Sequence, residues 1–384
     1  MQKTKPHLAQ VNPFRVMSVM QRAGELERAG RHIIHFEVGE PDFTTPRPII
    51  EAAKRALDEG LTQYTQAAGI RPLQEAIAQR YLQCNGVTVA PERIFVTPGA
   101  SGGLLLLAHK LVSAGDGVLM TDPAYPCVRN LVHLQSGIPQ LVAAGMERNF
   151  QPTVADLAAR REASSRGVWL ASPANPAGTV IERDELTTIC NWAQEQGLHI
   201  LMDEIYHGLH YTDGLPSVLE LEQGAYVVNS FSKYFGMTGW RLGWIVVPEA
   251  AVEQTTILAQ NLFISAPSIA QYAALAAFKD DTIAICEERR AAFRQRRDYL
   301  CTALAELGFG LPPRIEGAFY VYADISRFAD DCEQFCRQML EEHGVALTPG
   351  TDFGEHQARR YVRFAFTTSM ENLEEGVARM ARAL

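Results

Sequence analysis

One lysine, one arginine and two serines stand close together in the stretch from Asn229 to Trp244, at Ser230, Ser232, Lys233 and Arg241. Hydroxyl and guanidinium groups are good ligands for phosphate, and the three glycines of the stretch let backbone approach a ligand closely. A lysine near a bound phosphate and apolar groups can have a lowered pKa, and its amine can then form a Schiff base. The alternative is a polar surface loop. Five large apolar residues argue against that alternative: Phe231, Phe235, Met237, Trp240 and Trp244.

The same stretch resembles the lysine signature of the class I/II aminotransferases, which use pyridoxal 5'-phosphate (PLP) on the type-I fold. The matching positions are Ser230, Ser232, Lys233, Gly236, Gly239, Arg241 and Gly243. The resemblance implies that Lys233 holds PLP through a Schiff base. It also implies that Ser230 and Arg241 hold the cofactor phosphate, and that Ser232 can assist them.

A second stretch, Pro98 to Gly103, is predicted to be a glycine-rich turn between a strand and a helix that spans residues 104–112. Such a turn is a ready anion site, because free N–H groups and the helix dipole both face the ligand. Its spacing is neither that of a Walker loop nor that of a dinucleotide loop. On its own the turn could equally be structural. The resemblance implies that it binds the PLP phosphate through Gly99, Ala100 and Ser101.

Acidic and aromatic residues follow the strand predicted for Leu198 to Met202. Ligands of open α/β sheets bind beyond the carboxyl ends of the strands. The resemblance implies that Asp203 meets the pyridine nitrogen of PLP and keeps it protonated, so that the ring can accept electrons. It also implies that Tyr206 hydrogen-bonds the phenolic oxygen. His207 and His210 have an HxxH spacing, but the HExxH order of a zinc site is absent, so we predict no metal there.

Three further residues are expected around the cofactor. The resemblance implies that Tyr125 stacks on the pyridine ring, and a core tyrosine is the alternative. It implies that Asn175 donates to the phenolic oxygen and lies beside the substrate carboxylate. Tyr64 would reach the phosphate of the neighbouring subunit, which is the main indication of a homodimer; an ordinary half-buried tyrosine is the alternative. Asn261 is a weaker candidate for a contribution to the other subunit's site.

Two residues are expected at the α-carboxylate of the substrate. In the family, the backbone of a glycine at the place of Gly39 lies near this group. Arg363 lies in an apolar strand predicted for residues 361–366, and a buried arginine needs an anionic partner. The resemblance implies that Arg363 grips the α-carboxylate with two parallel hydrogen bonds. An internal salt bridge is the alternative.

The donor is expected to be a neutral or aromatic amino acid rather than aspartate. Some family members that favour dicarboxylic substrates carry a lysine at the position of Ser101. Because this chain lacks that lysine, aspartate is less expected as the main donor. The side-chain pocket is expected to involve Val16, Tyr64, Phe263 and Tyr320, which are apolar or aromatic.

Strands and helices alternate along the chain, and the resemblance implies an α/β protein with the PLP-dependent transferase type-I fold. We expect a mostly parallel seven-stranded sheet with helices on both faces, plus a smaller α/β domain. The large PLP-binding domain is expected at residues 41–275, and the small domain at residues 1–40 and 276–384. Among the other expected elements are a strand at 33–38, helices at 48–59, 183–196, 282–307 and 331–342, and a strand at 317–322.

Composition limits the classes of function. The chain has 384 residues and a net charge of -9, with 47% hydrophobic and 21% charged residues, which is ordinary for a soluble globular protein. The negative charge argues against a nucleic-acid partner. The five arginines between Arg289 and Arg297 share a probable helix with Glu287, Glu288 and Asp298, so we interpret them as a solvated helix face. No run approaches the ~20 apolar residues of a membrane helix.

The seven cysteines are scattered and contain no CxxC pair, which fits reduced, mostly buried thiols in a cytosolic protein. Cys332 and Cys336 share a predicted helix, but no second ligand pair accompanies them, so no metal is expected. The segment from Met1 to Gln10 is polar and lacks the apolar core of a signal peptide. We therefore expect a cytoplasmic protein without metal, membrane or nucleic-acid partner.

The resemblance extends from about Gly39 to Arg363, and it implies transfer of an amino group from an L-amino acid to a 2-oxo acid by a ping-pong mechanism. Lys233 would act as general base and then as general acid. A carbon–sulfur β-lyase on the same fold would share Lys233, Asp203 and Arg241, although the Gly-Met-Thr-Gly-Trp-Arg run resembles aminotransferases more. A non-catalytic PLP-binding regulator would need a DNA-binding domain, and the 38 residues before Gly39 contain no basic recognition helix. A non-enzymatic scaffold is disfavoured because the full set of site residues is present.

Overall fold

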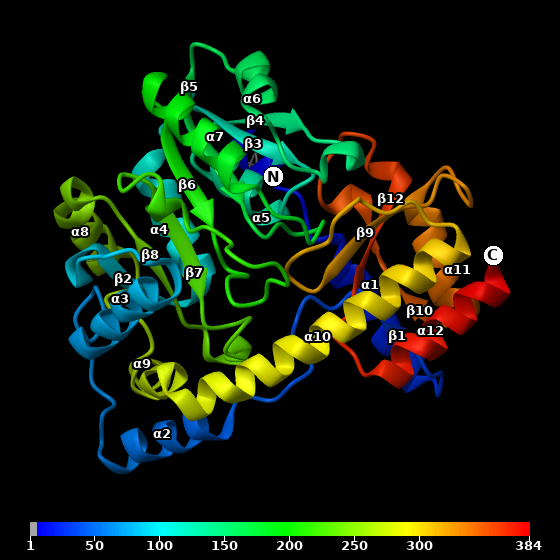
Figure 1. Ribbon diagram of the computed structural model, residues 1–384, viewed down its shortest axis with the longest axis horizontal. Helices are drawn as coiled ribbons and strands as arrows, with labels where there is room; N and C mark the ends of the chain where they lie inside the picture. Colours follow the sequence, from blue (N-terminus) through cyan, green and yellow to red (C-terminus); the bar gives the residue numbers. More distant parts are fainter. Residues whose placement is uncertain (1–5) are drawn as a thin grey trace, which may run out of the picture.

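The computed structural model describes residues 6–384, so the prediction about a signal peptide in residues 1–10 falls partly outside the described residues. A seven-stranded sheet with the order β2-β8-β7-β6-β5-β3-β4 forms the centre of the molecule (Figure 1). Strands β3 to β7 are parallel, while β8 is antiparallel to both β2 and β7. The mostly parallel seven-stranded sheet is therefore confirmed. Its strands are β2 (Ile94–Thr97), β3 (Gly117–Asp122), β4 (Ile138–Ala143), β5 (Ser165–Ala171), β6 (His199–Asp203), β7 (Tyr226–Ser230) and β8 (Gly243–Val246).

The strand order reverses direction between β3 and β5, because the chain passes outward from β3 to β4 and then returns to β5. Ligands of open α/β sheets bind at such a reversal, outside the carboxyl ends of the strands. Tyr125, Asn175 and Asp203 lie at or just beyond the carboxyl ends of β3, β5 and β6. The topology therefore brings these three residues, far apart in sequence, to one edge of the sheet.

Helices cover both faces of this sheet, as predicted. One face packs against apolar side chains of α4 (Gly99–Leu111), α5 (Pro126–Leu134) and α8 (Val252–Leu262). The other face packs against α3 (Arg71–Asn85), α6 (Val154–Arg160), α7 (Arg183–Glu195) and α9 (Ser268–Ala274). The local sequence explains the ends of α3, since Pro72 occupies its first turn and Gly86 closes it with a left-handed φ of 67°.

Both ends of the described chain meet in a smaller α/β assembly. There β9 (Tyr320–Asp324), β12 (Tyr361–Ala365) and β11 (Thr348–Pro349) form an antiparallel sheet, and β1 (Ile34–His35) pairs with β10 (Val345–Ala346). Its helices are α1 (Arg15–Arg28), α11 (Cys332–His343) and α12 (Met370–Ala383). The long helix α10 (Asp280–Leu307) contacts α2 (Arg47–Asp58) near one end of the molecule and α12 at the other (Figure 1). The exact domain limits at residues 41, 275 and 276 stay a prediction.

Several predicted elements differ from the structure. The glycine-rich stretch is no turn, because α4 begins at Gly99 and includes the residues up to Ser101 in its first turn. The strand predicted from residue 317 begins at Tyr320, because Ala318 has a left-handed φ of 55° that breaks the extended run. The strand predicted at 33–38 is only two residues long. The stretch from Asn229 to Trp244 begins in β7 and ends in β8, so only its centre is a loop.

The arginine-rich part of α10 is not one solvated face: Arg294 is exposed, but the prediction was wrong for Arg296. Arg296 is only 9% exposed, and its guanidinium makes two hydrogen bonds to Asp42, at 2.7 and 2.9 Å. Arg289 and Arg296 both lie over the ring of Phe43, at 5.2 and 5.0 Å. The helix is covered on several sides because it lies against both parts of the molecule, and the charged residues of its sequence alone do not reveal these contacts.

The seven cysteines, all within the described residues, are free thiols, and four of them are buried. In residues 6–384 no helix combines the length and the apolarity needed to cross a membrane. The same residues contain no group of three or more His, Cys, Asp or Glu side chains arranged to hold a metal ion.

Candidate active site

A cavity of about 330 Å³ lies beyond the carboxyl ends of the central strands. It collects nearly all the residues that the sequence predicted for the site. Those that line it are Gly39, Ala100, Ser101, Tyr125, Asn175, Asp203, Tyr206, Ser230, Ser232, Lys233, Arg241 and Arg363. Gly99 lies directly behind Arg241, since a Cβ atom at Gly99 would come within 2.7 Å of its Nη2 atom. Tyr64 does not line the cavity and is 80% exposed.

Lys233 presents its amine to the cavity from the loop after β7. Its Nζ atom donates a hydrogen bond to the carbonyl oxygen of Gly39 at 2.6 Å. Burial, together with the positive charges of Arg363 and Arg241, lowers the pKa of Lys233 to about 8, while Glu40 and Asp203 act in the opposite direction. A larger fraction of this amine than of an ordinary lysine is therefore deprotonated near neutral pH and can act as a nucleophile.

The first turn of α4 and the strand β8 form a cradle of backbone groups. A Cβ atom at Gly243 would lie 2.7 Å from the backbone nitrogen of Ala100, so the close contact of these segments requires glycine. The hydroxyl groups of Ser230 and Ser232 lie 2.9 Å apart beside this turn. Arg241 is exposed toward the cavity, where one of its guanidinium nitrogens donates to the carbonyl of Thr238. Free helix N–H groups, two hydroxyls and a guanidinium together suit a phosphate group.

Asp203, the last residue of β6, also lines the cavity and is 7% exposed. Its carboxylate accepts a hydrogen bond from the backbone N–H of Ile205 at 3.0 Å. Burial, assisted by Glu204, raises the pKa of Asp203 to about 6, although Ile205 and Lys233 lower it. A protonated ring nitrogen placed next to Asp203 would stabilise the ionised carboxylate.

Two aromatic hydroxyls and one aromatic ring also line the cavity. The hydroxyl of Tyr206 is 3.0 Å from the hydroxyl of Tyr320. Tyr125 is half-buried and stacks on Phe14 with ring centroids 6.1 Å apart, so it lines the cavity rather than the core. Asn175 accepts a hydrogen bond from Arg363 through its Oδ1 atom at 3.0 Å. Its amide nitrogen is thus left to donate to a ligand.

Arg363 is 5% exposed and has no carboxylate partner among the described residues. Besides Asn175, it donates to the carbonyl oxygen of Glu37 at 2.7 Å and to the hydroxyl of Thr348 at 3.3 Å. Its Nε atom is buried and lacks a hydrogen-bond partner within residues 6–384. The guanidinium is therefore held in place by neutral acceptors and keeps an unused N–H group, which suits an incoming carboxylate.

The structure corrects the predicted side-chain pocket. Val16 and Tyr320 line the cavity, but Phe263 and Tyr64 do not. Of the segment that carries Val16, the sequence analysis missed Phe14, which precedes α1, and Met17 and Met20 of α1, which complete the wall. The carboxylate of Asp352 fixes this helix by accepting hydrogen bonds from the backbone N–H groups of Arg15 and Val16, at 2.8 and 3.4 Å. The apolar side chains of α1 alone could not reveal which surface they cover.

Comparison with known proteins agrees with this geometry. The family model for aminotransferases of class I and II matches residues 31–380. The chain belongs to this family. The protein is therefore an enzyme that transfers amino groups, and its cofactor is PLP. The family match therefore supports an enzyme rather than a non-catalytic scaffold or regulator.

Several relatives of this aminotransferase cover its whole length. The valine–pyruvate aminotransferase of Mycobacterium tuberculosis is 38% identical over 375 residues, which are 97% of this chain and 96% of that protein. The crystal structure of an aminotransferase from the same organism has a TM-score of 0.96 at 38% identity and covers 100% of this chain and 99% of that one. The aspartate aminotransferase of Thermus thermophilus with maleate has a TM-score of 0.95 at 33% identity, with 100% of both chains covered.

The residues of this aminotransferase fit PLP at both ends of the cofactor. The cradle at Gly99, Ala100 and Gly243 has no room for a side chain but presents N–H groups to a phosphate. At the other end, the raised pKa of Asp203 shows a buried carboxylate whose ionised form would be stabilised by a cation. Lys233 lines the same cavity, and its pKa is lowered. An amine must be deprotonated to react with the aldehyde group of PLP, so the lowered pKa suits this role.

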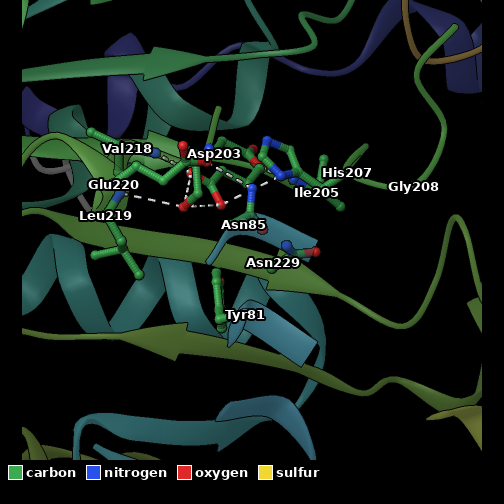
Figure 2. A network of polar contacts seen from close by, with 12 residues as sticks. Tyr81, Asn85, Asp203, Ile205, His207, Gly208, Val218, Leu219, Glu220 and Asn229 are labelled. Atoms are coloured by element: carbon green, nitrogen blue, oxygen red, sulfur yellow. Dashed lines mark hydrogen bonds and ion pairs between the residues drawn. The ribbon is translucent and has the colours of Figure 1, made fainter. Parts of the chain in front are cut away.

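A buried acidic residue missed by the sequence analysis lies directly behind Asp203 in the aminotransferase. Glu204 is 0% exposed, and its carboxylate accepts hydrogen bonds from the hydroxyl of Ser217 at 2.9 Å and from the N–H of Val218 at 2.8 Å. Figure 2 shows the polar contacts of this region, with Asp203, Val218 and Glu220 labelled. Glu204 thereby anchors the segment that carries Asp203 and Tyr206. A single glutamate next to a catalytic aspartate gave no separate signal in the sequence.

Replacement of Glu204 by glutamine should change how stability depends on pH. Burial raises the pKa of Glu204 to about 8, with Glu220 adding to the effect and the Val218 N–H and Ser217 hydroxyl opposing it. A glutamic acid side chain in the unfolded protein titrates near 4.3. The contribution of Glu204 to the free energy of unfolding is therefore complete below that pH, and it is lost as the pH rises through 8. The wild-type free energy of unfolding should therefore fall by about 1.4 kcal/mol per pH unit relative to Glu204→Gln in this window.

Denaturant titrations between pH 5 and 8.5 would measure this difference, with the exposed Glu306→Gln on α10 as the control. Parallel pH profiles for wild type and Glu204→Gln would show that Glu204 is not protonated in the folded protein.

Proposed function

We propose that this aminotransferase moves the amino group of a neutral or aromatic L-amino acid to a 2-oxo acid by a ping-pong mechanism. The observation that carries the donor preference is the charge distribution in the cavity. Its charged lining residues are Asp203, Lys233, Arg241 and Arg363, and each is accounted for by the cofactor or the α-carboxylate. Within the described chain, no further cation lines the cavity to bind a second carboxylate.

The apolar wall supports the same preference. Val16, Met17 and Met20 of α1 form one side of the cavity, and Tyr320 forms another. Burial of apolar donor side chains against this wall is favourable by about 25 cal/mol for each Å² removed from water. Methionine side chains adapt to partners of different shape, so branched and aromatic donors can share the pocket.

The chain's residues divide the work of the reaction. Arg363 and Asn175 orient the α-carboxylate, and Lys233 takes the proton from the substrate α-carbon and later returns it. Asp203 would keep the ring nitrogen of PLP protonated, while Tyr206 and Asn175 would donate to its phenolic oxygen. The hydroxyls of Ser230 and Ser232, the guanidinium of Arg241 and the first turn of α4 would hold its phosphate. When bound, PLP supplies a ring that withdraws electrons from the substrate.

We also propose a homodimer in which Tyr64 completes the site of the neighbouring subunit. The support is its exposure of 80% together with its absence from the cavity of its own chain. An isolated aromatic residue with this exposure gains little in a monomer, but it could contact a phosphate from across an interface. Light scattering of the purified protein would test the proposal, and a monomeric mass would contradict it.

The function is tested by adding single amino acids to the PLP-loaded enzyme without any keto acid. Valine, alanine, phenylalanine and aspartate should be compared at equal concentrations. We expect loss of the visible cofactor band and release of the matching keto acid, with aspartate slower than the neutral donors. Aspartate reacting fastest would contradict the donor preference. Release of pyruvate and ammonia from a cysteine-type substrate, without change in the cofactor band, would instead indicate a carbon–sulfur lyase.

A further inference from the structure

A second cavity of about 320 Å³ lies on the other face of the central sheet. It is enclosed by the carboxyl-terminal part of α3, the segment that follows β6, and the middle of α10. Figure 2 looks into this region, where Tyr81, His207 and Asn229 come from three different segments. None of its lining residues lines the PLP cavity, so the two cavities are separate.

The two cavities share the same chain segments as walls. Successive residues of a strand point to opposite faces of a sheet. Ser230 lines the PLP cavity, while Asn229 lines the second cavity beside Trp244. In the same way, Lys233 lines the first cavity and the next residue, Tyr234, lines the second. A ligand in the second cavity would therefore contact residues adjacent in sequence to those that hold PLP.

The second cavity carries an excess of positive charge. Arg290 is paired with Glu287, which also accepts a hydrogen bond from the hydroxyl of Tyr234 at 2.6 Å. Arg80 is half-buried, and no carboxylate in residues 6–384 lies within ion-pair distance of it. Its guanidinium instead lies over the ring of Tyr234, 5.4 Å from the centroid. One cation thus remains unneutralised at the cavity, which favours an anion.

Other lining groups define the kind of anion. The Nε2 atom of His207 is buried and has no hydrogen-bond partner within the described chain. Burial lowers the pKa of His207 to about 4, so its ring is neutral at physiological pH and does not add a second charge. Leu215, Phe235 and Trp244 provide apolar surface beside these polar groups. A ligand with one negative charge and a flat, apolar body would match both parts.

We propose that this second cavity is a binding site for a small organic monocarboxylate, whose carboxylate pairs with Arg80 and whose body lies against Phe235 and Trp244. Arg80 meets the carboxylate as a two-pronged donor, a geometry that guanidinium groups favour. The inference is independent of the donor preference proposed above.

The test uses benzoate as the probe and the PLP-loaded enzyme in isothermal titration calorimetry. The wild type should bind two benzoates per chain, one at Arg363 and one in the second cavity. Arg80→Ala should retain the first event and weaken the second by about 10–100-fold, the loss expected for a charge-assisted hydrogen-bonded pair. Arg80→Lys keeps the charge but loses the two-pronged donor, so it should weaken the second event less. Arg294→Ala, an exposed arginine on α10, is the matched control.

The variants separate this proposal from the proposed role of Arg363. The second site would be overturned if each wild-type chain bound only one benzoate and Arg363→Ala abolished that binding. It would also be overturned if each chain bound two benzoates and Arg80→Ala changed neither affinity. Loss of one event in Arg80→Ala, combined with no loss in Arg363→Ala, would support the second site and contradict the role of Arg363. Circular dichroism and PLP content would establish that each variant is folded, and a misfolded Arg80→Ala would leave Arg80→Lys to decide.

Discussion

Replacement of Lys233 by alanine is expected to abolish amino-group transfer, with a fall in kcat of about 10⁴-fold or more. The expectation follows from the two tasks assigned to one amine, which bonds the cofactor and moves the α-proton. The Nζ atom of Lys233 lies in the cavity against the carbonyl of Gly39, at 2.6 Å. Within the described chain, no other lysine lines this cavity, so no neighbouring amine could take over.

Stopped-flow absorbance after mixing the PLP-loaded protein with one amino acid would measure the effect. Lys233→Ala should still bind PLP through the phosphate cradle and Asp203, but its visible spectrum should lack the band of the lysine-bound cofactor. Lys54→Ala, at an exposed lysine on α2, is the control and should behave as wild type. A rate for Lys233→Ala within tenfold of wild type would contradict the role of Lys233.

The sequence predicted the cofactor side of the site more fully than the substrate side. Asp203, Asn175 and Tyr125 come at or just after strand ends, and the sheet topology brings strand ends together whatever the details of packing. Each prediction came from the resemblance of a local motif to the family, and the strand order of the structure brings these motifs to one edge of the sheet. The residues predicted for the phosphate site, Gly99, Ala100 and Ser101, lie in the first turn of a helix rather than in a turn before it.

Side chains placed by tertiary packing were harder to predict. The wall formed by α1 depends on the contact of its first turn with Asp352, a residue more than 330 positions away. Phe263 was an apolar residue in a plausible position, yet it packs against the core cluster of α8 and lies outside the cavity. Arg296 looked solvated because its neighbours in sequence are charged, whereas its partner Asp42 comes from the other end of the chain. Periodicity and motifs carry no information about such distant contacts.

Replacement of Arg363 by lysine should lower kcat/KM for every amino-acid donor by about 10²–10³-fold, mainly through a higher KM. Lysine keeps the positive charge but loses the planar two-pronged donor that binds a carboxylate. The orientation of Arg363 comes from Asn175, the carbonyl of Glu37 and Thr348, and its guanidinium also lies 4.4 Å from the ring centroid of Tyr320. A lysine could not satisfy these acceptors and the substrate together.

Steady-state kinetics with valine and phenylalanine would measure the change, and Arg359→Lys provides the control. Arg359 pairs with Asp331 at a side-chain exposure of 64%, so its replacement should leave kcat/KM within about twofold of wild type. If the role of Arg363 is to grip the α-carboxylate, the loss should be similar for all donors, because every donor carries that group. A loss confined to one donor would instead place Arg363 at the donor side chain, and an unchanged KM would remove it from substrate binding altogether.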